Sequence, residues 1–441
     1  MKILARTIVL LVSLLPALAL ATEAGINSTT LFRFEERSIP GFSKQTVVPA
    51  TQFIGADLGK IGDENLSFHF YGWGRLDLAD RSTAEGDTDG DLTYGYLKYH
   101  FPKANSEIKA GRFFTFEGGV AEQIDGVAAR ADLLPAYAGL ALSLFSGAPV
   151  KLDRANDNKG DYIVGGRLSY RYASIIELGA SAVHEGGMDR NGPNSDLKNY
   201  RQTVGGDIWL SPHKMVELNG RTYYNTATSG ISEHSYHAIV TPLAGLLLAA
   251  EFNQNYLKDF FSASSLRSLF NPDGDDKLTT FGAGITYTIA KPVELTLDYK
   301  HFARDTRKDS NRFGGELRLT LADGKVRSGL SYHRVDAGER KASAGLEGFP
   351  ITSYNEVRGF ALYTKDKYDA SLDSIVHIFD NKIFNTKTAY EIQASAGYRI
   401  MPSLKLSGDL SYGDNPQQSD EVKGLIRLTF NYNYASKGAG K

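Results

Sequence analysis

Charged side chains recur at every second or fourth position in many segments of this sequence. That spacing places them on one face of an extended strand. Rings of such groups along a water-filled passage set ion preference, whereas isolated ones form hydrated ion pairs. By spacing we expect Glu217 to pair with Arg221, and the basic excess of the later segments suggests anion preference or an acidic partner. We predict that the following residues line a pore: Arg75, Asp77, Glu217, Arg221, Asp298, Lys300, Arg312, Glu316, Arg318, Lys325, Arg327, Lys405, Asp409, Lys423 and Arg427.

One acidic segment departs from this alternation. Residues 113–126, FFTFEGGVAEQIDG, contain the pair Gly118-Gly119, at which the backbone can bend sharply. One interpretation is an extracellular rim that folds into the pore, and the other is a kinked corner of a barrel with a satisfied ion pair. In the first case the inward loop carries Glu117, Glu122 and Asp125.

The sequence contains no motif for catalysis or for a resident cofactor. It has no G-x-S-x-G, no H-E-x-x-H and no phosphate-binding glycine loop. The acidic runs 87–91 and 273–276 resemble fragments of calcium loops without the full spacing, so we predict no metal site and interpret them as solvated loops or weak lipopolysaccharide contacts. Without cysteine, the chain has no C-x-x-C-H haem site, and we expect no cofactor in this chain and no enzyme activity.

The elements that must position these charges are strands. In Glu421–Tyr434, EVKGLIRLTFNYNY, one alternating series is apolar and aromatic and the other is almost wholly polar. The pattern recurs along the chain, with short turns alternating with longer loops, which include 380–388 and 413–420. This predicts an all-β fold, a large transmembrane antiparallel β-barrel of about 20–22 strands with short periplasmic turns and longer extracellular loops. Strand parity requires one further strand near residues 121–132, and such a barrel would be roughly 40 Å across.

The N-terminus and the composition fit an exported membrane protein. Residues 1–21 have the charged, apolar and A-x-A regions of a signal peptide. We expect a lead-in or first hairpin over 22–64, the barrel over 65–434 and a periplasmic tail over 435–441. We expect the Gram-negative outer membrane as the location, with outer-membrane lipid and lipopolysaccharide as partners. The formal net charge of −2 gives no reason to expect nucleic acid.

Four segments carry a resemblance to a known group of proteins. These are LSFHFYGWGRLDL at 66–78, GDLTYGYL at 90–97, AGRFFTFEGGVAEQIDG at 110–126 and LFSGAPV at 144–150. They resemble porin-like outer-membrane barrels of metal-reducing deltaproteobacteria, some of which sheathe multihaem c-type cytochromes. The resemblance implies no catalytic residues, and it is the sole source of the cytochrome role.

Two functions follow as hypotheses. The first is a porin-like channel that gives a water-filled or partner-filled passage across the outer membrane. The second is a structural sheath of a porin–cytochrome complex for electron transfer across that membrane. Conductance of the purified protein, and co-purification of haem protein, distinguish the two.

Overall fold

The computed structural model describes residues 21–37, 45–83, 86–117, 119–133, 138–150, 161–186, 200–256, 277–305, 308–338, 352–416 and 418–435. Within these ranges no helix is long and apolar enough to cross a membrane. The predicted signal peptide up to residue 20, the acidic run 273–276 and residues 436–441 of the predicted tail lie outside the described residues.

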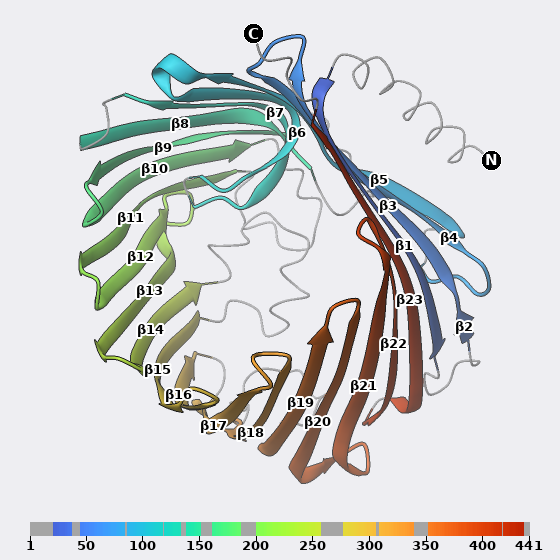
Figure 1. Ribbon diagram of the computed structural model, residues 1–441. Helices are drawn as coiled ribbons and strands as arrows, with labels where there is room; N and C mark the ends of the chain where they lie inside the picture. The colour runs from blue at the N-terminus through green and yellow to red at the C-terminus, as the bar shows by residue number, and fades with distance from the viewer. Residues whose placement is uncertain are drawn as a thin grey trace. The chain divides into compact units, whose positions relative to one another are not determined.

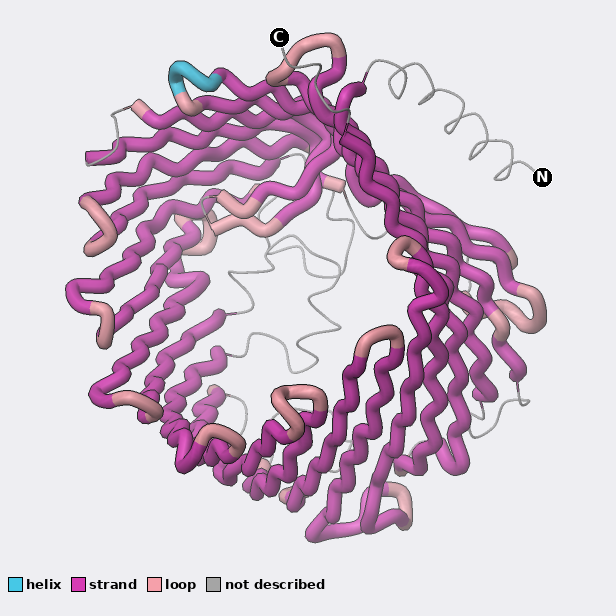
Figure 2. The backbone as a smooth tube through the Cα atoms, viewed as in Figure 1, coloured by secondary structure: helices cyan, strands magenta, loops and turns pink. Residues whose placement is uncertain are grey.

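Strands make up nearly all of the described chain (Figures 1 and 2). In the described ranges a single 3-10 helix, Pro102–Ala104, lies between two of them. In chain order the strands are β1 Ala21–Arg37, β2 Gln45–Val47, β3 Pro49–Ile61, β4 Leu66–Asp77, β5 Thr88–Phe101, β6 Ser106–Thr115, β7 Glu122–Asp132, β8 Ala138–Pro149, β9 Tyr162–Tyr172, β10 Ile176–Gly186, β11 Arg201–His213, β12 Val216–Asn225, β13 Gly230–Leu243, β14 Leu246–Tyr256, β15 Lys277–Ala290, β16 Val293–Arg304, β17 Ser310–Leu321, β18 Val326–Asp336, β19 Tyr354–Lys365, β20 Tyr368–Ile383, β21 Thr386–Met401, β22 Leu404–Asn415 and β23 Gln418–Ala435.

The fold class is the predicted one, an all-β closed antiparallel β-barrel. All 23 named strands belong to one sheet. Because β2 and β3 pair in succession with the same strand, β1, they are two parts of one strand, which gives 22. The sheet closes because β1 also pairs with the last strand, β23, from Glu23↔Ala435 to Glu35↔Lys423.

Two uncertain parts of the sequence are now assigned. The first hairpin is part of the barrel: β1 pairs with β3, and the strand is interrupted only at Val48, before Pro49. Proline lacks a donor for the ladder, which explains why the interruption falls there. The strand required near 121–132 is β7, which pairs with both β6 and β8.

Two predicted loops are wrong. Strand β20 continues to Ile383 and β21 begins at Thr386, so residues 380–388 hold only a two-residue turn. Phe384 and Asn385 both have positive φ, 45° and 71°, as hairpin turns of this length require. Likewise, β22 ends at Asn415 and β23 begins at Gln418. The polar residues of both segments are typical of a loop, but the parts of strands that extend past the apolar band have no reason to be apolar.

The chain divides into two compact units. Unit 1 comprises residues 1–100, 317–332 and 355–441, and unit 2 comprises residues 101–316 and 333–354. In unit 1, β21, β22, β23, β1, β3, β4 and β5 form a continuous series of antiparallel pairs. In unit 2, antiparallel pairing runs from β6 through each neighbouring strand to β16.

In both units the two faces of the sheet differ in polarity. Large apolar side chains on one face are exposed: Ile426 at 56%, Leu410 at 59% and Leu297 at 52%. The residues between them, such as Arg427, Asp409 and Asp298, form ion pairs on the other face. A continuous exposed apolar face is stable against lipid rather than water. We call it the outer face, and the polar one the inner face.

Candidate functional site on the inner face

Most of the predicted pore-lining residues form ion pairs, some between adjacent strands, some across an intervening strand and some within one strand. In unit 1, Lys405 Nζ lies 2.7 Å from Asp369 Oδ1, and Arg427 Nη2 lies 3.7 Å from Asp409 Oδ2. Lys423 Nζ lies 2.8 Å from Glu421 Oε2 along one strand. These side chains are partly exposed, so each pair contributes little to stability.

In unit 2 the pairs connect strands that are either adjacent or separated by one strand. Lys300 Nζ lies 2.6 Å from Glu251 Oε1, and Arg312 Nη1 lies 2.7 Å from Asp298 Oδ1. His333 Nε2 lies 2.8 Å from the other oxygen of the same aspartate. One carboxylate therefore holds side chains from two other strands.

The expected pairing of Glu217 with Arg221 is wrong. Arg221 instead pairs across the strand boundary with Glu233, at 2.7 Å. Glu217 accepts hydrogen bonds from Trp209 Nε1, at 3.2 Å, and from Asn219 Nδ2, at 3.1 Å. Glu233 is a diagonal neighbour of Arg221, since Arg221 pairs with Ser235 and Tyr223 with Glu233. Diagonal neighbours on adjacent strands are about 7–8 Å apart, whereas residues four apart on one strand are about 14 Å apart, which decides the partner.

At the long-loop end of β4, Arg75 and Asp77 are held by the loop that follows. The two side chains are 9% and 0% exposed and lie 3.6 Å apart. Ser82 donates its backbone N–H to Asp77 Oδ2 at 2.8 Å, and Arg75 donates to Thr83 Oγ1 at 2.9 Å. This pair anchors a loop, so its side chains are less available to a solute than those of the other pairs.

The remaining predicted residues are placed by strand parity alone. Glu316 and Arg318 alternate with the exposed outer-face residue Leu317, and Arg327 lies in β18. Lys325 lies in the turn before β18, where its carbonyl accepts a hydrogen bond from Thr364 N–H at 2.8 Å. All four therefore lie on the inner face or at its edge.

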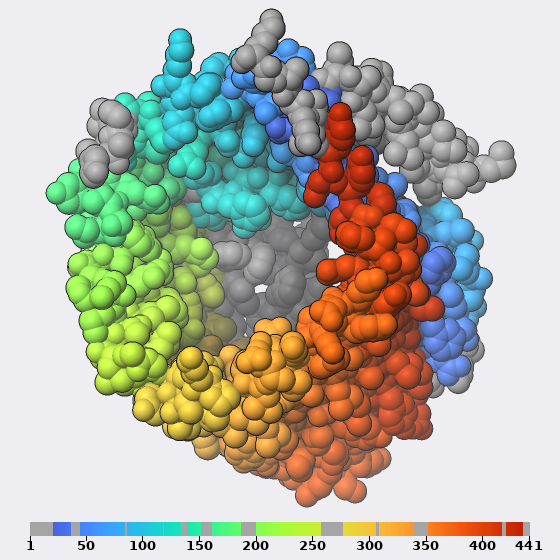
Figure 3. Space-filling view, viewed as in Figure 1, coloured from blue at the N-terminus to red at the C-terminus, as the bar shows by residue number. Residues whose placement is uncertain are grey.

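The described residues of 116–121 in unit 2, which are 116, 117 and 119–121, fold over the inner face, and we call 116–121 the inward segment. Val120 is only 5% exposed. A Cβ at Gly119, whose φ is +74°, would lie 2.6 Å from the ring of Tyr223 in β12. That ring also lies across Gly205, since a Cβ there would be 2.2 Å from it. Figure 3 shows the cyan-to-teal atoms of this region inside the arc of the green strands of unit 2.

An ion-pair cluster holds the end of the inward segment. Arg201 of β11 pairs with Glu122, the first residue of β7, and with Glu185 of β10 at 3.1 Å. The three side chains are 15%, 26% and 9% exposed. Beneath them is a small apolar core on the inner face that contains Phe113, Ile124, Phe145, Ile163 and Val183, each 3% exposed or less.

The predicted inward loop is thus corrected at one residue. Glu117 lies in the inward segment and Glu122 at its end, but Asp125 lies inside β7 on the outer face. Its parity is that of Val127, 53% exposed, and opposite to that of buried Ile124. Arg112 Nε lies 2.7 Å from Asp125 Oδ1, and this is the ion pair that the alternative interpretation required. Both interpretations of the acidic segment therefore describe part of it.

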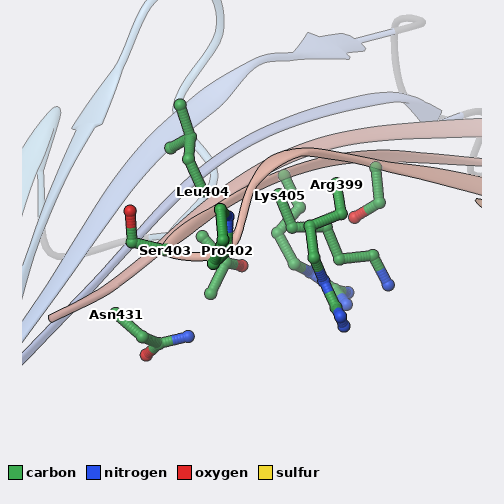
Figure 4. A pocket seen from close by; sticks show the side chains of 9 residues that line it. Arg399, Pro402, Ser403, Leu404, Lys405 and Asn431 are labelled. Atoms are coloured by element: carbon green, nitrogen blue, oxygen red, sulfur yellow. The ribbon is translucent and has the colours of Figure 1, made fainter. Parts of the chain in front are cut away.

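A small cavity lies beside the β21–β22 turn in unit 1. Its lining includes Arg399, Lys405, Arg427 and Asn431. Figure 4 shows Arg399 and Lys405 on one side of this turn and Leu404 pointing to the opposite side. Within the described part of the chain, Arg399 forms no ion pair, so the cavity carries a net positive charge.

Together, a closed antiparallel barrel, an exposed apolar outer face and a charged inner face define an outer-membrane β-barrel. No family model matches the chain, and no curated protein matches its sequence. Solved structures match its fold. A mutant of the ferric enterobactin receptor PfeA from Pseudomonas aeruginosa matches over 93% of this chain and 81% of its own, with a TM-score of 0.59 and 11% identity.

Two further structures agree with this. The siderophore receptor PirA from Pseudomonas aeruginosa has a TM-score of 0.59 and 13% identity, over 93% of this chain and 81% of its own. The copper transporter OprC has a TM-score of 0.54 and 13% identity, over 93% and 80%. These are receptors and a transporter rather than enzymes. At such identities the similarity establishes the outer-membrane barrel fold and no narrower family, so the resemblance to barrels of metal-reducing deltaproteobacteria stays a prediction.

Proposed function

We propose that this protein is a porin-like channel that lets small hydrophilic solutes cross the outer membrane through a water-filled passage. The supporting observation is the inner face, on which ion pairs with partly exposed side chains follow one another from strand to strand. Such a wall is stable only beside water or a polar partner, because dry burial of so many charges would be costly.

The inward segment lies over the inner face of unit 2 and so narrows the proposed passage there. It is held by a buried arginine between two glutamates and by close contact with an aromatic ring, so it is a packed element rather than a free loop. A segment of this kind restricts solute size, and its removal would enlarge the passage.

The β21–β22 cavity, with its uncompensated Arg399, supports a preference for anions. We place this end in the periplasm, because bacterial barrels have their longer connections on the extracellular side. The connections from β10 to β11 and from β14 to β15 are long, and they join the opposite ends of the strands. Anions leaving the passage would then meet the positive cavity last.

The test is conductance of the purified protein in planar bilayers, combined with liposome swelling in neutral solutes of increasing size. The proposal predicts stable open currents and a size cutoff that rises when residues 116–121 are replaced by a short Gly-Ser linker. A protein that conducts only after a co-purifying haem protein is removed would instead favour the cytochrome sheath. Absence of both current and swelling from correctly folded protein would reject the channel.

A further inference from the structure

We propose that the inner face of β3–β5 carries a binding track for a neutral saccharide built of pyranose rings. This inference rests on the proposed channel function and names a class of solute for it. We define the aromatic track as Phe53, His69, Tyr71, Trp73, Tyr94 and Tyr96, all within unit 1.

Five rings of the track contact one another in series across three strands, and Trp73 lies opposite Phe53 in the register. Phe53 and Tyr71 have centroids 6.2 Å apart and are stacked at an interplanar angle of 22°. Tyr71 and Tyr94 are 5.7 Å apart at 20°. Tyr94 and Tyr96, on one strand, are 6.0 Å apart. The contacts therefore form a continuous series rather than isolated pairs.

The register arranges the track in three levels along the strands. Phe53 pairs with Trp73, Tyr71 with Tyr94, and His69 with Tyr96, whose rings are 4.9 Å apart. Successive levels are two residues apart, which corresponds to about 6.8 Å along a strand. The track thus runs from the long-loop end toward the short-turn end, in the direction in which a solute would move.

Hydrogen-bonding groups lie beside the rings. His69 Nδ1 lies 2.6 Å from Asp57 Oδ1, and its Nε2 lies 3.1 Å from Ser67 Oγ. Gly55 pairs with Tyr71, and the Asn27 amide leans over this glycine, since a Cβ there would be 2.5 Å from Asn27 Oδ1. The rings and these polar groups are half-buried or exposed, so both remain within reach of a ligand.

This combination favours a saccharide over an ion or a purely apolar ligand. Ring faces take up the C–H faces of a pyranose, and neighbouring carboxylate, amide and imidazole groups take up its hydroxyls. Asp57 is held by His69 at 2.6 Å and is therefore an oriented acceptor for a hydroxyl group, and because it is a carboxylate, a cation is the competing ligand that the titration below tests. Several similar weak sites in series let a ligand enter, move and leave.

Trp73 provides a direct reporter, because the chain has only two tryptophans and the other is Trp209 in unit 2. In the Trp209→Phe background, the emission of Trp73 is titrated with maltohexaose, with the open-chain polyol sorbitol at matched hydroxyl concentration and with tetramethylammonium. We expect a saturable change with maltohexaose and none with the other two. No saturable change with maltohexaose, or saturation by tetramethylammonium instead, would overturn the proposal.

Two matched double variants test the rings themselves. Tyr71→Leu with Tyr94→Leu should raise the half-saturating concentration of maltohexaose about tenfold. Tyr368→Leu with Tyr398→Leu removes a ring pair at 5.1 Å on the outer face and should leave it unchanged. Equal effects of the two would also overturn the proposal. If the first variant fails to fold, Phe53→Leu takes its place with the same criterion.

This readout separates the inference from the function on which it rests. Fluorescence in detergent requires no current, so a saturable response in a protein that does not conduct would reject the channel and retain the track. Normal conductance without any response of Trp73 would reject the track and retain the channel.

Discussion

Ile426→Arg is the sharpest test of which face meets the lipid. Ile426 lies near the middle of β23, is 56% exposed and faces Phe32 of β1 and Gly408 of β22. Because Gly408 has no side chain, the arginine has room, and the penalty arises from its charge. Arginine on the lipid face near the midplane costs about 2–4 kcal/mol, a factor of roughly 30 to 700 in the folding equilibrium.

Arg427→Leu, one residue away, is the control. Its guanidinium is on the inner face, 45% exposed and 3.7 Å from Asp409, so its loss should change stability by less than about 1 kcal/mol. Both variants are folded into phospholipid vesicles and titrated with urea, with the heat-modifiable band on gels as the measure of folded barrel. Equal destabilisation, or a larger loss for Arg427→Leu, would refute the assignment of the faces.

Three further changes test the inner face. Arg201→Met leaves Glu122 and Glu185 without their shared cation in a mostly buried site and should destabilise the barrel by about 3–5 kcal/mol. Glu122→Gln keeps the pair of Arg201 with Glu185 and should cost about 1 kcal/mol. Urea unfolding in vesicles compares the two variants, and equal losses of stability would contradict the shared-cation geometry. Gly119→Val, at a φ of +74° and against a tyrosine ring, should displace the inward segment and raise the hydrogen exchange of residues 116–121, so unchanged protection would count against the packing. Arg399→Gln should shift the reversal potential in a KCl gradient toward K⁺, and an unchanged potential would exclude the β21–β22 cavity as a source of anion preference.

The barrel could be predicted from the sequence because its rule is local. Alternation of Val422, Ile426 and Phe430 with polar neighbours identifies β23 without knowledge of any partner strand. Because successive strands must alternate in direction, a further strand was then required between β6 and β8. This strand is β7, although its own apolar and polar residues alternate weakly. The two missed hairpin turns failed for the opposite reason. A run of polar residues indicates the end of a strand only within the lipid-facing apolar band. Strands that extend beyond this band can be polar on both faces, so their polar residues do not indicate a loop.

The inward segment could be predicted only in part. Gly118-Gly119 indicated a bend in the sequence. The ring against which Gly119 packs belongs to Tyr223, about a hundred residues later, and the sequence did not indicate that contact. The same limit explains the wrong pairing of Glu217 with Arg221. Spacing along one strand was visible, whereas the register that brings Glu233 beside Arg221 was not. Asp125 was grouped with Glu122 because they are near in sequence, yet alternation places their side chains on opposite faces.

Register therefore determines both stability and pore chemistry in this barrel. Arg167 of β9 illustrates this: its Nη2 lies 2.8 Å from Glu177 of β10 and 2.6 Å from Asp207 of β11. A slip of one residue in β9 would turn Arg167 toward the lipid and leave both carboxylates without it. Each such misplaced charge carries a penalty of about 2–4 kcal/mol near the midplane, so slipped registers are strongly disfavoured. The ion pairs of the inner face therefore have two effects. They provide a polar surface for a solute, and they favour the one strand register in which these pairs can form.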